Sequence, residues 1–147
     1  MRAGVILFNP QSKQTLLIHR WKNGEEYFVI PGGGAESGET AVQAAQREIQ
    51  EELGWILSEE QLQPAFTFRN GHRLEIYFRA TISHTSTPMI QGEEALRSHA
   101  KNIYQPEWLD IEAIPDLNLR PAGLKNLLLD CLTQEGLKTS LIVVKYQ

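Results

Sequence analysis

The sequence has almost no cysteine, no run of basic residues and no long apolar segment. Its single cysteine, Cys131, excludes an internal disulfide, so we expect a buried thiol in a protein of the reducing cytoplasm. The formal charge of −4, with Lys and Arg scattered along the chain, argues against binding to a nucleic-acid backbone. The first apolar run ends at Phe8, which is too short for a secretion signal. No segment approaches the roughly 20 apolar residues that cross a bilayer, so no membrane association is expected.

The length of 147 residues suits one domain, which we expect to span residues 1–147. Residues 83–105 are long, polar and poorly periodic, which indicates a functional loop. The remaining pattern predicts a mixed β-sheet with two main helices. Strands are expected at residues 3–8, 14–21, 27–30, 65–69, 73–82, 107–109 and 139–146, helices at 41–53 and 121–132, and a helical turn at 111–114.

A glycine-rich segment lies directly before the first predicted helix. Residues 31–34, Pro-Gly-Gly-Gly, are expected to form a loop because glycine and proline interrupt regular structure. The helix can begin at Ser37 or at Glu39 and Thr40, and Gly54 supplies its stop.

The carboxylates of this helix occupy an unusual position. On a helical wheel Glu48 and Glu52 fall beside the apolar stripe, Glu51 lies at its flank, and neutral glutamines occupy the opposite side. Most glutamate runs are solvated, but these acids face the body of the protein and need a counter-charge. Arg47 can neutralise only one of them, so a hard divalent cation such as Mg²⁺ is indicated.

The segment from Gly33 to Trp55 resembles the Nudix box, whose pattern is G-x5-E-x7-R-E-U-x-E-E-x-G-U with U aliphatic. The matching residues are Gly33, Glu39, Arg47, Glu48, Ile49, Glu51, Glu52 and Gly54. Trp55 is the one departure, and we expect it to change packing and not chemistry. The resemblance implies an α/β fold: the Nudix-type α/β/α sandwich with a mixed sheet and a loop-helix-loop catalytic motif.

The resemblance also implies an activity, namely hydrolysis of a nucleoside diphosphate linked to another group, X, with Mg²⁺ or alternatively Mn²⁺ as cofactor. By position, Glu48, Glu51 and Glu52 would bind the metal together with the carbonyl of Gly32 or Gly33. The base would be a box glutamate, Glu51 or Glu52, or a later one such as Glu93 or Glu94. Gly33, Glu39 and Arg47 would support the site.

The substrate is less constrained by the sequence. Arg97 is a candidate for binding phosphate, with a surface salt bridge as the alternative, and Tyr104 is a candidate for stacking on a nucleobase. Arg20, Arg69 and Lys101 are further basic candidates. The group X stays open among a nucleotide, a nucleotide sugar and a nucleoside triphosphate. A nucleotide-binding sensor without hydrolysis is the competing hypothesis, disfavoured by the intact box, and a homodimer is compatible with the sequence.

Overall fold

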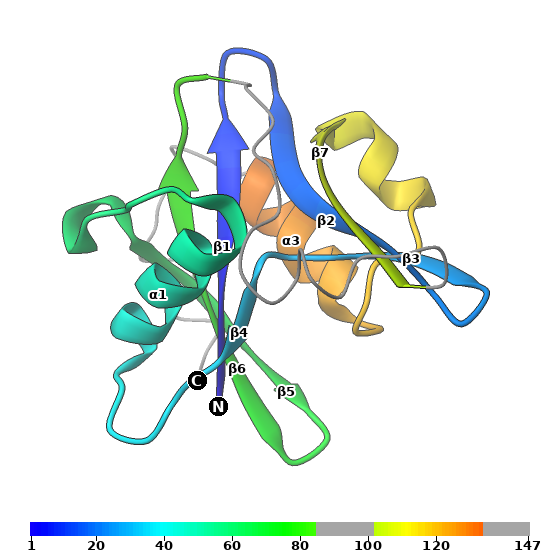
Figure 1. The fold of residues 1–147 in the computed structure, drawn as a ribbon. Helices are drawn as coiled ribbons and strands as arrows, with labels where there is room; N and C mark the ends of the chain where they lie inside the picture. The colour runs from blue at the N-terminus through cyan, green and yellow to red at the C-terminus, as the bar shows by residue number, and fades with distance from the viewer. Residues whose placement is uncertain (85–101, 134–147) are drawn as a thin grey trace.

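The computed structural model describes residues 1–84 and 102–133 (Figure 1). Its strands are β1 (Arg2–Asn9), β2 (Gln14–Lys22), β3 (Glu25–Val29), β4 (Gly32–Gly34), β5 (Gln63–Asn70), β6 (Arg73–Thr81) and β7 (Asn102–Asp110). Its helices are α1 (Ala41–Leu53) and α3 (Leu124–Thr133), with 3-10 turns η1 (Glu59–Gln61) and η2 (Ile111–Asp116).

The seven strands form one mixed sheet with the path β3-β2-β1-β6-β5. β1 and β6 are parallel, and the other pairs are antiparallel. β7 pairs with β2 along its whole length, whereas the other edge of β2 pairs with β1 in its first part and with β3 in its second. β1 likewise pairs with the short strand β4 at its N-terminal end. β1 and β2 therefore pair over only part of their lengths, and β4 pairs with β1 where β2 does not.

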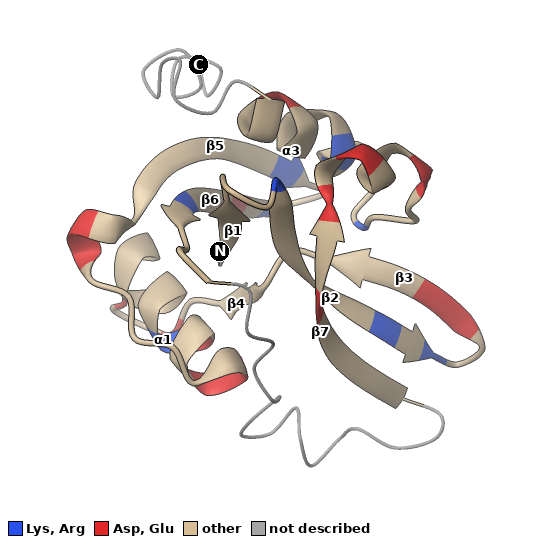
Figure 2. Ribbon diagram, turned by 90° about the horizontal axis from the view of Figure 1, so that it is seen from above, with Lys and Arg blue, Asp and Glu red and all other residues tan. Residues whose placement is uncertain are grey.

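The two helices cover opposite faces of the sheet, as Figures 1 and 2 show. One core contains α1 residues such as Ala45 and Ile49 together with Val5 of β1. The other contains Leu128 of α3 with Phe66 of β5 and further strand residues. The predicted α/β/α sandwich with a mixed sheet is confirmed.

Local signals set the ends of α1 where the sequence predicts them. The side chain of Thr40 accepts a hydrogen bond from the Gln43 N–H at 3.1 Å, and the Gln43 side chain accepts one from the Thr40 N–H. Gly54 ends the helix in the left-handed region at φ 73°. The helix therefore begins and ends through contacts between near neighbours in sequence.

Other predictions are corrected by the structure. The glycine segment 32–34 is a short strand, because its backbone pairs with β1. Residues 102–105, assigned to the long loop, belong to β7, and the second helix begins at Leu124 and not at Pro121. The predicted strand 139–146 lies outside the described residues.

Two further expectations concern burial and the membrane. Cys131 is buried in α3, as predicted. Among the helices described for residues 1–84 and 102–133, none is long and apolar enough to span a bilayer.

Candidate active site

A cleft of about 540 Å³ lies between α1, β4 and the arm formed by β2 and β7. The backbone of Gly32–Gly34 and the side chains of Glu48 and Glu52 line one side of it. The inner carboxylates predicted from the helical wheel therefore do face the body of the protein, and they open onto a solvent-accessible cavity.

Gly33 and Glu48 fit together because Gly33 has no side chain. A Cβ placed on Gly33 would lie 2.4–2.6 Å from the three carboxyl atoms of Glu48, so this carboxylate occupies the space that any other residue at position 33 would fill. Glu52, only 8% exposed, accepts a hydrogen bond through Oε1 from the Gly32 N–H at 2.9 Å. Both carboxylates are thus held against the glycine strand.

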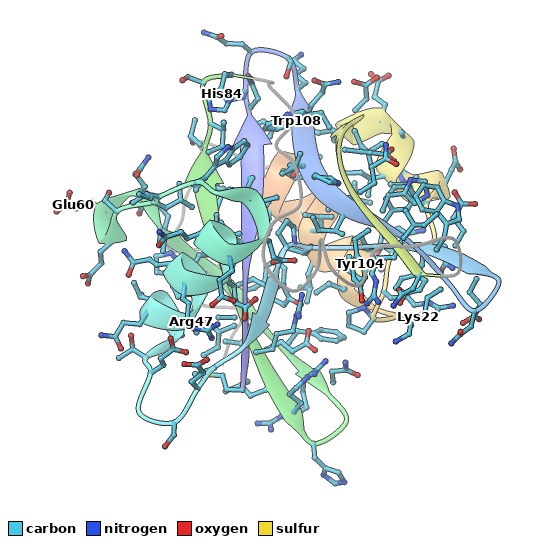
Figure 3. The ribbon with its side chains drawn as sticks, in the orientation of Figure 1. Lys22, Arg47, Glu60, His84, Tyr104 and Trp108 are labelled. Atoms are coloured by element: carbon cyan, nitrogen blue, oxygen red, sulfur yellow. The ribbon has the colours of Figure 1, made fainter. Side chains whose placement is uncertain are left out.

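Arg47 connects the start of α1 to its acids. Its Nε and Nη2 donate to the two oxygens of Glu39 at 2.7 and 3.0 Å, a bidentate pairing. Nη1 donates to Glu48 at 2.9 Å and to Glu51 at 3.3 Å, and Nη2 also donates to the Gly34 carbonyl at 2.9 Å. One guanidinium therefore ties the glycine strand, the segment before the helix and two helical acids together (Figure 3).

This network shifts the ionisation of its members. The Arg47 hydrogen bonds, with a further one from the Glu36 backbone, lower the pKa of Glu39 from 4.5 to about 2. Pairing with Glu39 chiefly, and with Glu48 and Glu51, raises the pKa of Arg47. The support is consequently fully charged at neutral pH.

A buried carboxylate, Glu75 of β6, lies among the residues that line the cleft. Glu75 is 0% exposed and accepts hydrogen bonds from the Tyr77 hydroxyl at 2.5 Å, Arg73 at 2.8 Å and Asn70 at 3.1 Å. Burial opposes its ionisation, but these bonds more than offset that cost, so the pKa of Glu75 is lowered. Burial raises the pKa of Tyr77, with the neighbouring Glu75 adding to the effect.

Arginine and tyrosine side chains form the wall of the cleft across β4 from α1. Arg20 of β2 lies 4.1 Å from the ring centroid of Tyr104 of β7 and 5.5 Å from that of Tyr27. The Nη2 of Arg20 also donates to the Tyr104 hydroxyl at 2.5 Å. Arg120 lies 4.3 Å from the Tyr27 ring and pairs with Glu25 at 3.2 Å.

The predicted site residues are only partly brought together. Gly32, Gly33, Glu48, Glu52, Arg20 and Tyr104 line the cleft. Glu51 is half exposed (51%) beside Arg47, outside the lining, and Arg69 is exposed on β5, also outside it. Glu93, Glu94, Arg97 and Lys101 lie outside the described residues.

Sequence reasoning missed several cleft residues, namely Arg2, Arg73, Glu75 and Arg120. Only Glu75 carried a usable signal, as the single acid of the predicted strand that contains RLEIYFRAT. The others reach the cleft through strand pairing that the sequence alone does not define.

The donor set of the cleft fits a small, hard cation. Glu48 and Glu52 offer carboxylate oxygens one helical turn apart, beside the carbonyls of the glycine strand. Within residues 1–84 and 102–133 no three His, Cys, Asp or Glu side chains converge on a metal-sized point. Mg²⁺ suits this arrangement, since it is usually held by one or two carboxylates and completes its shell with water and substrate phosphates.

Residues 1–130 match the family model of the NUDIX domain, and the chain therefore belongs to the Nudix family. The resemblance found in the sequence is confirmed, and the family is one of hydrolases that typically depend on a metal ion.

Solved structures with the same fold include three at 20% sequence identity. A MutT structure, from work on the Aliivibrio salmonicida and Vibrio cholerae proteins, has a TM-score of 0.63 and covers 90% of this chain and 96% of its own. A Caenorhabditis elegans Ap4A hydrolase has a TM-score of 0.64, with 88% and 94% covered. The Escherichia coli dihydroneopterin triphosphate pyrophosphohydrolase has 0.63, with 90% and 94% covered. A search of curated proteins gave no match.

Proposed function

We propose that this protein is a Mg²⁺-dependent pyrophosphohydrolase that cleaves a nucleoside diphosphate linked to another moiety. The observation that carries the proposal is the position of Glu48 and Glu52, two acids one turn apart on α1 that line the cleft against the glycine strand. Such carboxylates are strongly disfavoured beside a phosphate-bearing ligand unless a cation lies between them.

In this proposal Glu48 and Glu52 are the principal metal ligands, Glu51 is a further ligand, and the Gly32 carbonyl completes the protein contribution. Mg²⁺, or Mn²⁺ in its place, supplies positive charge that offsets the charge of the diphosphate oxygens and makes its phosphorus more electrophilic. The hydrogen bond from the Gly32 N–H fixes the orientation of Glu52, and Gly33 lets Glu48 approach the strand closely.

Hydrolysis then needs a base and a leaving group. A water oxygen bonds to phosphorus, its proton passes to a carboxylate, and the bridging P–O bond breaks with the electron pair leaving on the released phosphate. Glu52 and Glu51 are the base candidates among the described residues, and Glu94 is the candidate beyond them.

Arg47 and Glu39 act as positioning residues in this scheme. Arg47 is bonded to Glu39, Glu48 and Gly34 at once, so it holds helix and strand at a fixed separation. Supports that orient metal ligands typically change affinity or activity by about 10- to 100-fold when removed.

The test is hydrolysis of a panel of nucleoside triphosphates, nucleotide sugars, ADP-ribose, dinucleoside polyphosphates and coenzyme A, with and without Mg²⁺. Glu48→Gln and Glu52→Gln should each abolish Mg²⁺-dependent turnover without loss of fold. Glu60→Gln is the matched control, because Glu60 is exposed on η1, away from the cleft (Figure 3).

Near-full activity of either cleft variant would refute the ligand assignment. Tight nucleotide binding by folded wild-type protein, with no turnover across the panel, would instead support the sensor hypothesis.

A further inference from the structure

Arg20 differs from Arg73 and Arg120, two other arginines of the cleft lining, because no acid pairs with it. Arg2 also lines the cleft, but it donates to the Ile30 carbonyl at 2.8 Å and its charge acts on the buried Glu75. Arg73 pairs with Glu75 at 2.8 Å, and Arg120 pairs with Glu25 at 3.2 Å. Within residues 1–84 and 102–133, no carboxylate oxygen lies within ion-pair distance of Arg20. Its positive charge is therefore the one on this wall that a ligand can neutralise.

The side chain of Arg20 is held in a fixed orientation. Tyr104 and Tyr27 lie on it at 4.1 and 5.5 Å, and the Tyr104 hydroxyl accepts a hydrogen bond from Nη2. Nε is buried and has no acceptor among the described residues. A buried donor without an acceptor lowers the stability of the fold. Such a group in a folded protein therefore calls for a functional or structural explanation.

The rings decide which kind of ligand group Arg20 can meet. The Tyr104 ring lies against the guanidinium at 4.1 Å, so a nucleobase would have to compete with that ring to stack on Arg20. The N–H groups at the edge of the guanidinium match phosphate oxygens in geometry and charge.

The position of Arg20 separates its role from that of the acids. Figures 1 and 2 both place α1 on one side of β4 and the arm of β2 and β7 on the other. The same cleft is lined by Glu48 and Glu52 at one side and by Arg20 and Tyr104 at the other, so it gives a substrate held at the acids room to reach this arm. The group that arrives there meets an uncompensated positive charge.

We propose that Arg20, held by Tyr104 and Tyr27, selects substrates whose group X carries its own phosphate charge. The substrate class is then nucleoside triphosphates and longer polyphosphates, and nucleotide sugars with an uncharged X are poor substrates. This inference rests on the proposed function, since it takes the scissile diphosphate to lie at the acids of α1.

The experiment compares substrates that share a nucleobase and differ in X: ATP with ADP-glucose, GTP with GDP-glucose, and UTP with UDP-glucose. For the preferred base, wild-type kcat/KM should be at least about tenfold higher for the triphosphate. Arg20→Gln should remove about tenfold or more from the triphosphate value, mainly through KM, and leave the sugar value within about threefold.

Arg69→Gln is the matched control, because Arg69 is exposed on β5 and outside the cleft lining, and it should change neither value. Arg20→Lys keeps the charge and should retain part of the preference. Melting curves establish that each variant is folded. Equal losses for both substrates in Arg20→Gln, or a wild-type preference for the nucleotide sugar, would overturn the proposal, and the wild-type comparison holds even if Arg20→Gln does not fold.

A binding measurement distinguishes failure of the proposed function from failure of this inference. If no substrate is hydrolysed, calorimetric titration with an α,β-methylene triphosphate and with the matching nucleotide sugar measures the same preference as a ratio of Kd values. A preference of about tenfold that Arg20→Gln abolishes would sustain the role of Arg20 without catalysis. No preference would overturn it.

Discussion

Replacement of Gly33 by alanine should remove activity and leave the fold nearly intact. The added Cβ would lie 2.4 Å from the carboxyl carbon of Glu48, whereas ordinary contacts begin near 3.4 Å, so the carboxylate must retreat by about 1 Å. The atoms displaced are the end of a flexible side chain, which can rotate without moving the backbone.

The rate of hydrolysis and the stability of the fold should therefore respond differently to Gly33→Ala. A displacement of about 1 Å at a catalytic group can cost about 100-fold in rate, and we expect a loss of that order in kcat for the best substrate at saturating Mg²⁺. The melting temperature should change by less than about 4 °C, since that corresponds to roughly 1 kcal/mol in a domain of this size.

Two neighbouring glycines provide the comparison. A Cβ at Gly34 meets nothing closer than the Met1 carbonyl at 4.0 Å, so Gly34→Ala should be nearly silent in both assays. At Gly32 the Cβ would come 2.2 Å from the backbone oxygen of Ala3, so Gly32→Ala should destabilise the fold itself. If Gly33→Ala kept activity within threefold of wild type, or Gly34→Ala lost as much, the fit between Gly33 and Glu48 would have no catalytic importance.

Three other predictions test the support and the core. Arg47→Lys keeps the charge but loses the bidentate fork to Glu39, so kcat/KM should fall by about tenfold or more while circular dichroism is unchanged; undiminished activity would mean that charge alone suffices. The pKa of Glu39 is lowered to about 2, so its contribution to stability is present above its usual 4.5 and is lost as the pH falls toward 2. Glu39→Gln should thus melt below wild type at pH 7, and the two curves should converge between pH 5 and 2; a constant gap would contradict this origin. Ile49→Ala removes a fully buried side chain of α1 and should lower the free energy of unfolding, measured by urea titration, by about 2–5 kcal/mol. A loss below about 1 kcal/mol would mean that neighbouring side chains close the cavity.

The sequence predicts best what is decided locally. The ends of α1 follow from Thr40, Gln43 and Gly54, which interact with near neighbours, and the orientation of Glu48 and Glu52 follows from helical periodicity alone. The site residues of the box are likewise close together in the chain, so their proximity needs no knowledge of the sheet.

Residues joined by distant pairing were not predictable in the same way. Gly32–Gly34 looks like a loop in the sequence, and it is a strand because its backbone pairs with β1. Arg2 reaches the cleft because β1 lies between β4 and β6. Residues 102–105 look irregular because their strand character comes from pairing with β2, 80 to 86 residues earlier. Propensity carries little information about such contacts, because their partners are set by the tertiary fold.

The dependence of β2 on β7 has a consequence for biosynthesis. β1, β2, β3, β4 and α1 all emerge from the ribosome within the first 53 residues, whereas Tyr104 and the rest of β7 are made some 50 residues later. The acids and the glycine strand can therefore assemble on the nascent chain while the partner of Arg20 has not yet been translated. Because long-range strand pairing is slow, the wall opposite the acids is expected to be the last part of the cleft to form. A ribosome-bound chain stalled before β7 would then expose one edge of β2, and that edge is where chaperone contact or misassembly should concentrate.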